Sequence, residues 1–201
     1  LKLEELNFGG GFGIRYLPYD RAPALADFLD PMMEMVQEWS WKENLPMPVC
    51  AIEPGRWIVG EAGITLYKVI AVKGIPGVRT YVAVDGGMGD NIRPALYNAQ
   101  YHAEIVSTSA GCQPIAKEKT LRTVTIAGRY CESGDIIAKD ATLPDPNPGD
   151  ILAVYSTGAY CFAMSSNYNR VPRPALVIVK NGDYRLSVRR ETYDDMLKRE
   201  I

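Results

Sequence analysis

The sequence predicts an α/β segment over residues 1–56 followed by an all-β segment over residues 57–201. Before residue 56, one long helical pattern lies between two short strand-like runs. After it the chain shows short β-type runs separated by turn residues. The change falls at Glu53–Arg56, where a carboxylate, a guanidinium and a glycine follow the end of a strand. We therefore expect Glu53–Arg56 to be the junction between two architectures and part of a site.

The first segment has the order strand, helix, strand. Residues 1–8 and Pro48–Ile52 are strand-like, and Arg21–Leu45 between them repeats apolar residues at spacings of three and four. This order predicts two parallel strands joined by a helix whose Met and Trp side chains lie in the core. Pro31 interrupts the helical pattern, so either it kinks one helix or Asp30-Pro31 begins a second one.

A glycine-rich loop, Gly9–Gly13, follows the first strand. Consecutive glycines carry no side chains, so a ligand such as a phosphate can contact backbone N–H groups directly. The alternative is a plain turn, because glycine is also a common turn residue.

The second segment contains many short strand-like runs with turn residues between them, which favours an antiparallel barrel or sandwich. The expected strands are Trp57–Val59, Ile64–Val72, Arg79–Asp85, Leu121–Ala127, Ile136–Leu143, Asp150–Tyr155, Pro174–Lys180 and Tyr184–Arg189. Asn181-Gly182-Asp183 joins the last two as a hairpin, and Glu191–Ile201 is expected to be a short terminal helix.

Composition limits the possible partners. A net charge of -2 gives no general electrostatic attraction to nucleic acid or to an anionic membrane. No apolar run approaches the roughly 20 residues that span a bilayer. The chain begins at Leu1 without a signal-like segment, so we expect a fragment or a trimmed chain.

The cysteines favour a reduced, cytoplasmic protein without a structural metal site. Cys50, Cys112, Cys131 and Cys161 form no CxxC pair, and His102 is the single histidine in the sequence. A structural zinc site is therefore not expected. A mid-sized chain with few cysteines needs no disulfide.

Two further patterns could carry chemistry. Cys131-Glu132 places a thiol beside a carboxylate. Arg129 could activate the thiol by lowering its pKa, and Glu132 would oppose this. The alternative is a buried, inert cysteine. Arg93 and Tyr97 are four residues apart, so they either share one helical face or lie separately on the surface. Arginine grips carboxylates in a two-pronged fork, so such residues suit a ligand that bears a carboxylate.

Taken together, these segments resemble the C-terminal half of the diaminopimelate decarboxylases, a family of fold-type III pyridoxal-phosphate enzymes. The resemblance covers nearly the whole chain. It rests on Gly9–Ile14, Glu53–Arg56, Asp85–Met88, Asp90–Arg93, Tyr130–Asp135, Thr157–Tyr160 and Arg189–Thr192. It implies decarboxylation of meso-diaminopimelate to L-lysine, the last step of lysine biosynthesis.

The resemblance also implies a fold and a cofactor, pyridoxal 5'-phosphate. Residues 1–56 would be the last βα units of a (β/α)8 barrel, and residues 57–201 an antiparallel β-barrel domain. The implied cofactor-binding residues are Gly11, Glu53, Pro54, Gly55, Arg56 and Tyr160. The glycine N–H groups would hold the phosphate and Glu53 would pair with the pyridinium nitrogen.

The substrate site implied by the resemblance takes up the far end of diaminopimelate. Its implied residues are Arg56, Arg93, Tyr97, Glu132 and Tyr160. Cys131 would be the catalytic proton donor, reaching the site from the partner subunit of a homodimer. The resemblance implies a cytoplasmic bacterial enzyme, or a plastid enzyme if the source is a plant.

One feature of the family is missing from these 201 residues. The Schiff-base lysine lies in the N-terminal half of such enzymes, and Lys68, Lys73 and Lys117 match no family motif. The chain alone is therefore expected to be inactive. The alternatives are a related decarboxylase of ornithine, arginine or carboxynorspermidine, or a non-catalytic homologue that binds or regulates. A distal carboxylate clamp of Arg93, Tyr97 and Glu132 favours diaminopimelate over ornithine.

Overall fold

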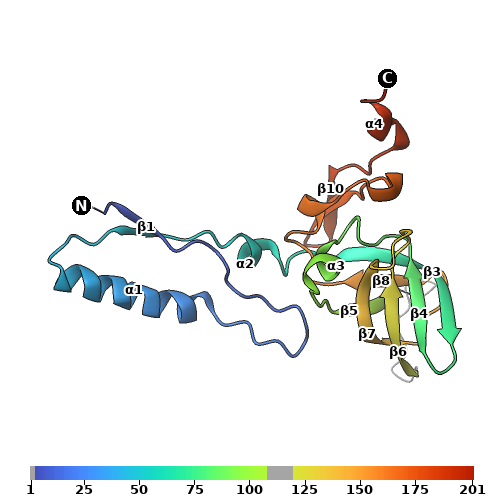
Figure 1. Ribbon diagram of the computed structural model, residues 1–201, viewed down its shortest axis with the longest axis horizontal. Helices are drawn as coiled ribbons and strands as arrows, with labels where there is room; N and C mark the ends of the chain where they lie inside the picture. The colour runs from blue at the N-terminus through green and yellow to red at the C-terminus, as the bar shows by residue number, and fades with distance from the viewer. Residues whose placement is uncertain (1–2, 108–119) are drawn as a thin grey trace.

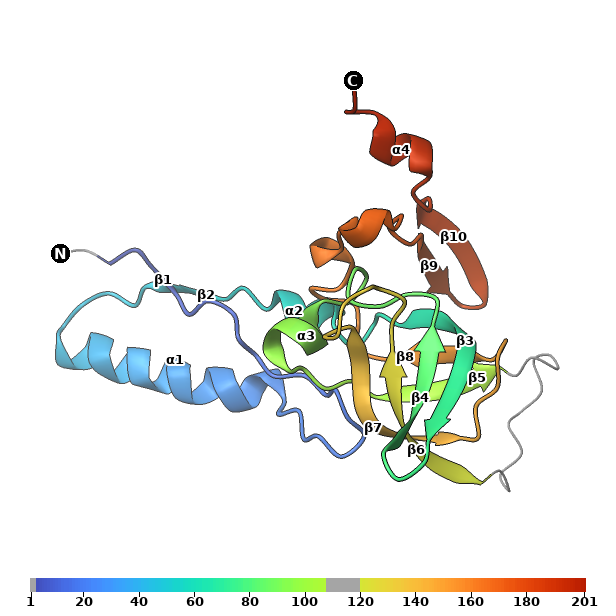
Figure 2. The same ribbon diagram turned by 45° about the vertical axis from the view of Figure 1, so that its right-hand side comes forward.

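The computed structural model describes residues 3–107 and 120–201, so Cys112 and Lys117 lie outside the described residues. The chain forms three parts (Figure 1): an extended N-terminal arm, a curled sheet, and a C-terminal hairpin with a short helix. The arm and the hairpin both project away from the sheet, as the second view also shows (Figure 2).

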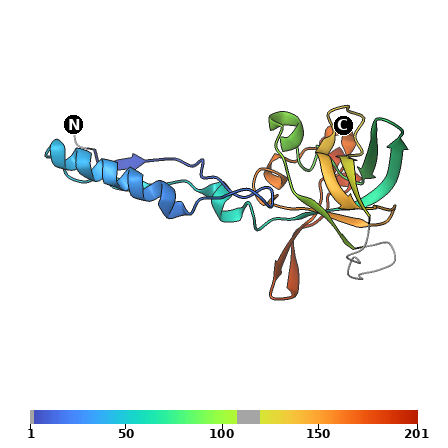
Figure 3. The same ribbon diagram turned by 90° about the horizontal axis from the view of Figure 1, so that it is seen from below.

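The arm is the predicted strand–helix–strand unit. β1 (Glu5–Asn7) and β2 (Val49–Ala51) pair in parallel, with Glu5 opposite Val49, and α1 (Leu25–Lys42) runs beside them (Figure 3). The parallel arrangement expected from the sequence is confirmed.

Helix α1 continues through Pro31 as one helix, which decides between the two alternatives. Pro31 is exposed, so water can reach the carbonyl that its missing N–H leaves without a partner. The expected burial of the Met and Trp side chains is wrong for the described chain, because Val36 and Ser40 are the buried residues of α1. Trp39 and Met35 are 39% and 69% exposed, because two short strands cannot cover a helix of this length.

The six-stranded sheet has the order β5-β8-β3-β4-β6-β7. The strands are β3 (Thr65–Ile75), β4 (Arg79–Val84), β5 (Ala103–Ser107), β6 (Leu121–Ala127), β7 (Ile136–Pro144) and β8 (Ile151–Val154). Neighbours are antiparallel except β4 and β6, which are parallel, so the expectation of a wholly antiparallel sheet is wrong at that pair. The edge strands β5 and β7 contact each other without pairing in the described sheet, which therefore curls into a half-barrel.

The hydrophobic core lies inside this curl. Along β3, Tyr67 and Val69 are buried while Leu66 and Lys68 face outward, as the twofold repeat of a strand requires. The core consists of Tyr67, Val69, Val82, Val84, Tyr101, Ala103, Ile105, Val124, Ile126, Ile137, Leu143, Leu152, Val154 and Cys161.

Two elements differ from the sequence expectation. Trp57–Val59 lies in a short helix, α2 (Gly55–Val59), and not in a strand, because Ile58 N–H donates to Pro54 O at 3.0 Å and continues a helical turn. Strand β5 was not predicted from the sequence; only five residues long, it carries Ala103 and Ile105 inward.

A joint of three glycines connects the arm to the sheet. Thr157 N–H donates to Gly63 O at 2.9 Å, and Gly158 N–H donates to Gly60 O at 3.0 Å. A side chain on Gly158 would collide with the Val59 carbonyl, and one on Gly63 would collide with the Gly158 backbone. The two backbones therefore touch directly, with no side chain between them.

The C-terminal part begins after two 3-10 turns, Phe162–Met164 and Tyr168–Arg170. β9 (Leu176–Lys180) and β10 (Asp183–Val188) form the predicted hairpin, followed by α4 (Tyr193–Leu197). Its two-residue turn is Asn181-Gly182, with φ of 54° and 86°, which are the positive values that a tight hairpin turn needs. Both strands are exposed along their whole length.

Glu191 fastens the base of this hairpin. Its carboxylate accepts hydrogen bonds from Arg173 Nη2 at 3.1 Å, Arg173 N–H at 3.0 Å and Asn167 Nδ2 at 2.5 Å. These contacts lower the pKa of Glu191 to about 2. In the described part of the chain, no helix is long and apolar enough to cross a membrane.

Candidate functional site

The glycine loop and Glu53 lie side by side at the carboxyl ends of β1 and β2. Parallel strands end at the same edge, so the two loops that follow them meet. Glu53 N–H donates to Gly9 O at 2.7 Å. The side chain of Asn7 joins the two loops, donating from Nδ2 to Glu53 Oε1 at 2.8 Å and accepting from Gly9 N–H at 2.7 Å. The Glu53 carboxylate is therefore held in place.

The positions in this loop require glycine for different structural reasons. Gly9 and Gly11 have φ of 72° and 89°, in the left-handed region that favours glycine. A Cβ on Gly10 would lie 2.6 Å from the Glu53 carbonyl oxygen. Within the described residues the Gly11 N–H has no hydrogen-bond acceptor, whereas the Gly55 N–H donates to Glu53 O at 2.9 Å. Of the two expected phosphate donors, only Gly11 is open in this structure.

Arg93 is a buried cation surrounded by aromatic rings. It opens helix α3 (Arg93–Tyr97), and the residue is 8% exposed. Its Nη1 donates to Tyr16 Oη at 2.8 Å and to Tyr101 Oη at 2.5 Å. Its Cζ lies 5.2, 5.7 and 5.9 Å from the ring centres of Tyr16, Tyr101 and Tyr160, which we call the tyrosine cage.

The tyrosine cage leaves the charge of Arg93 uncancelled. No carboxylate of the described residues forms an ion pair with it. Burial opposes the charged form, but the phenols of Tyr101 and Tyr16 outweigh this, so the pKa of Arg93 is raised. A buried cation without an anionic partner is costly unless a ligand supplies one.

Tyr160 closes the cage from the solvent side. It is 49% exposed, unlike Tyr101, which is 4% exposed. Its φ of 63° lies in the left-handed region, where a large side chain is strained. Strain of this kind gathers at functional sites, and the Tyr160 ring lies beside the Arg93 guanidinium.

A second cluster surrounds Cys131 and Glu132. Both residues are exposed, so the alternative of a buried Cys131 is wrong, and the reactivity of its thiol stays a prediction. Glu132 accepts from Tyr168 Oη at 3.4 Å. Their loop is fixed by Asp135, whose buried carboxylate accepts from Met88 N–H at 2.6 Å and Tyr130 N–H at 2.8 Å.

The remaining predicted residues do not join these clusters directly. Tyr97 lies in the same short helix as Arg93, but Arg93 is buried and Tyr97 is 61% exposed, so a shared binding face stays a prediction. Arg56 is half-buried in the first turn of α2. Among the contacts of the described chain, none links Arg56, Tyr97 or Cys131 to the tyrosine cage.

Five residues that shape these clusters were not among the predicted site residues. They are Asn7, Tyr16, Tyr101, Asp135 and Cys161, whose Sγ lies 3.7 Å from Tyr101 Oη. Asn7 could have been found, because a polar side chain that ends a strand next to a glycine loop often binds that loop. The others depend on contacts between segments that are distant in sequence.

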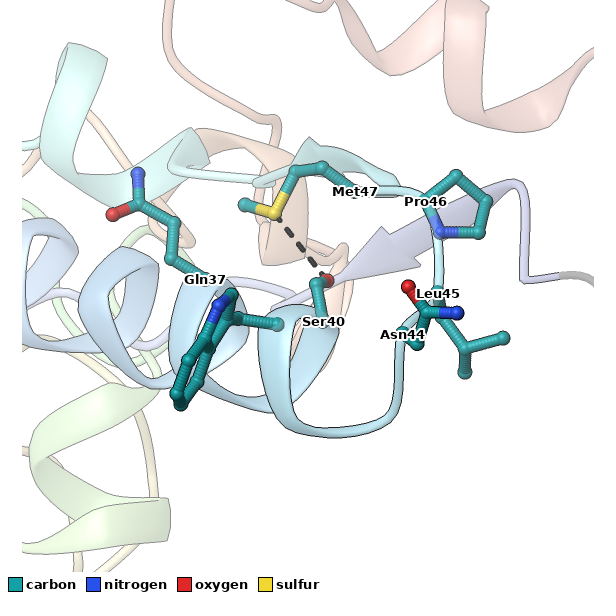
Figure 4. Close-up of a pocket in the computed structure, with 7 residues that line it drawn as sticks. Gln37, Ser40, Asn44, Leu45, Pro46 and Met47 are labelled. Atoms are coloured by element: carbon teal, nitrogen blue, oxygen red, sulfur yellow. Dashed lines mark hydrogen bonds between the residues drawn. The ribbon is translucent and has the colours of Figure 1, made fainter.

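Two surface hollows lie outside these clusters. One, of about 510 Å³, is at the turn between α1 and β2 (Figure 4), where Ser40 Oγ lies 3.6 Å from Met47 Sδ and no charged side chain lines the wall. The other, of about 410 Å³, lies beside the base of the hairpin, between Asp85, Asp90, Arg129 and Arg190. Neither contains a predicted site residue. No group of three metal-binding side chains occurs in residues 3–107 and 120–201.

The family described as "Pyridoxal-dependent decarboxylase, C-terminal sheet domain" matches residues 19–158. The chain belongs to this family. The curled sheet is therefore the C-terminal sheet domain of a decarboxylase of this family. The enzymes of the family depend on pyridoxal.

Individual relatives carry a narrower name. A diaminopimelate decarboxylase of Bacillus subtilis is 49% identical over 196 residues, which are 98% of this chain and 43% of that protein. Crystal structures of diaminopimelate decarboxylase from M. jannaschii, alone and with L-lysine, give TM-scores of 0.89 and 0.88 at 35% identity. Each match covers 100% of this chain and 44% of the M. jannaschii chain. The chain thus spans less than half the length of the relatives it matches.

Proposed function

We propose that the full-length protein decarboxylates meso-diaminopimelate to L-lysine with pyridoxal 5'-phosphate, and that this chain supplies part of the active site. The observation that carries the proposal is Arg93, a buried guanidinium held by two phenols and paired with no carboxylate of the described residues. A substrate with a second carboxylate, remote from the reacting one, supplies the missing anion. Relatives named diaminopimelate decarboxylase, one of them solved with L-lysine, support this choice.

The glycine loop and Glu53 fit the cofactor. The open N–H of Gly11 would hold the phosphate. Pro54 has no N–H and the Gly55 N–H donates to Glu53 O, so these two residues would shape the loop beside the phosphate. Glu53, fixed by Asn7, would hold a proton at the pyridinium nitrogen. Pyridoxal phosphate supplies an electron sink for the bond that loses CO2. Arg56 and Tyr160 would complete the cofactor contacts where cofactor and substrate meet.

Different residues would bind the carboxylate and the amine at the far end of diaminopimelate. Arg93 would bind the distal carboxylate, with Arg56, Tyr97 and Tyr160 around it. Glu132, an exposed carboxylate, would bind the distal amine. Ornithine carries no distal carboxylate and would leave Arg93 without an anion.

Cys131 would donate the proton that replaces CO2, acting from the partner subunit of a homodimer. It is exposed, and its loop contacts Tyr168 and not the tyrosine cage. This separation supports an active site completed by a second copy. The amino-acid substrate and L-lysine are small molecules of the cytoplasm, where we place the enzyme.

Residues 1–56 would be the last units of a (β/α)8 barrel, and residues 57–201 the β-barrel domain. The parallel pair β1–β2 and the exposed side of α1 support the first assignment, because a barrel would cover them. Lys68 and Lys73 are exposed on β3, far from the glycine loop in sequence, and neither belongs to a family motif. The 201 residues alone are therefore expected to release no CO2.

The test measures CO2 release by the full-length protein with added pyridoxal phosphate. The substrates are meso-diaminopimelate, L-ornithine and L-lysine, each at matched concentration. Release from diaminopimelate alone, lost in Arg93→Ala and Cys131→Ala but kept in Tyr184→Phe, is the expected result. Preference for ornithine would mean a related decarboxylase, and no release from any substrate by the cofactor-loaded protein would mean a non-catalytic homologue.

A further inference from the structure

We propose that Tyr16 and Tyr101 are positioning residues that lock the Arg93 guanidinium in one orientation, presenting its Nε–Nη2 edge to the substrate carboxylate. The inference rests on the proposed function and deepens it, since it states how the carboxylate site is oriented. Tyr16 and Tyr101 need not touch the substrate, because they act through Arg93.

Counting hydrogens fixes the orientation. A guanidinium has five N–H donors, two of them on Nη1. Both Nη1 donors are used, one by Tyr16 Oη at 2.8 Å and one by Tyr101 Oη at 2.5 Å. The end-on fork between Nη1 and Nη2 is therefore closed. The remaining fork, Nε–H with one Nη2–H, can still accept a two-pronged carboxylate.

The choice of phenols preserves the charge. A carboxylate partner would orient Arg93 equally well but would neutralise it and compete with the substrate. Burial raises the pKa of Tyr101 well above its ordinary value, and Arg93 only partly opposes this. The hydroxyl stays neutral at physiological pH and orients the cation without cancelling it.

The phenols are themselves fixed. Because the Tyr101 hydroxyl accepts from Arg93, its own proton is free for Cys161 Sγ at 3.7 Å. The ring of Tyr16 meets that of Tyr101 edge-on, with centres 5.2 Å apart. His102 N–H donates to the Tyr16 carbonyl at 3.1 Å, which ties the arm segment to the start of β5. The two residues that hold Arg93 are thus themselves fixed by contacts with other segments.

The experiment uses the full-length protein loaded with pyridoxal phosphate. Tyr101→Phe and Tyr16→Phe each remove one acceptor while keeping the ring. Tyr155→Phe is the matched control, because its hydroxyl also bonds a charged side chain, Glu104 at 3.1 Å, outside the cage. We expect KM for meso-diaminopimelate to rise about tenfold in the first two variants, with kcat within about twofold and no change in the control.

Binding measurements separate positioning from general damage. By calorimetry, L-lysine, which carries a carboxylate, is expected to bind Tyr101→Phe about tenfold more weakly, whereas cadaverine, which has none, binds unchanged. Adding Tyr101→Phe to Arg93→Lys should cost little more, since an ammonium has no planar fork to orient. If Tyr101→Phe does not fold, the half-buried Tyr16→Phe carries the same test.

An unchanged KM, equal weakening of both ligands, or additive effects with Arg93→Lys would overturn the inference. These results are distinct from failure of the proposed function. In that case the wild-type protein itself would not release CO2 from meso-diaminopimelate.

Discussion

Replacing Asp135 by Asn is expected to loosen the loop that carries Cys131 and Glu132. Asp135 is 3% exposed, and its carboxylate accepts from the backbone N–H groups of Met88 and Tyr130, at 2.6 and 2.8 Å. An asparagine keeps one accepting oxygen and turns an NH2 group toward the other donor. One backbone N–H and the new NH2 then lie buried without acceptors.

The magnitude follows from these two groups. Each unpaired buried donor costs about 1–3 kcal/mol, so two cost about 2–6 kcal/mol. The neutral amide is easier to bury than the carboxylate, whose pKa burial raises, so we expect about 2–4 kcal/mol of lost stability. There is little space for relief, because side chains on Gly87 or Gly128 would already collide with the carboxylate. For a unit of this size the loss lowers Tm by about 5–15 °C.

Two measurements test this expectation. Thermal unfolding of the full-length Asp135→Asn protein is compared with Asp183→Asn, an exposed position on β10 where no change is expected. Amide hydrogen exchange should speed up at Met88 and Tyr130. A Tm within about one degree of the control, with unchanged exchange at both amides, would show that Asp135 is not what joins the two loops.

Three further outcomes are expected. The folded-state pKa of Glu191 is about 2, so the ionised carboxylate contributes its full stabilisation of the fold above the ordinary pKa of 4.5, and this contribution is lost as the pH falls toward 2. The Tm difference between wild type and Glu191→Gln should therefore shrink over that pH range. Leu152→Ala, at a fully buried position, should cost about 3–5 kcal/mol in urea unfolding, against less than about 1 kcal/mol for Leu121→Ala, which is 64% exposed. Gly10→Ala places a Cβ 2.6 Å from the Glu53 carbonyl oxygen and should weaken pyridoxal phosphate binding about tenfold in a titration. Gly13 has open space around it, so Gly13→Ala is the control and should bind as the wild type does. Equal affinities of the two variants would count against the cofactor site.

The parts of the site that were predictable are those set by local rules. Strand, helix and strand in that order place Gly9 and Glu53 at one edge, and the structure joins them by a hydrogen bond of 2.7 Å. Asn181-Gly182 likewise specifies its hairpin turn.

The parts that were not predictable depend on distant contacts. Arg93 could be singled out as a carboxylate ligand, but its partner Tyr16 is 77 residues away, and nothing local marks that residue. Trp57–Val59 has strand-like composition, yet the turn begun at Pro54 makes it helical. The repeat of α1 identified its apolar face without showing what covers that face, because periodicity carries no information about the neighbour.

Under the proposed function, the glycine joint between arm and sheet has a consequence for substrate length. Arg56 follows β2 on the arm side of the joint, and Arg93 belongs to the sheet side. At the joint, Gly63 and Gly158 meet backbone to backbone, so no side chain there can act as a spacer. Under the proposed function, the main chain at this joint contributes to the distance between the cofactor and the distal carboxylate of the substrate. Under the proposed function, accepting a longer or shorter diamino acid would require a change in the length of the chain itself.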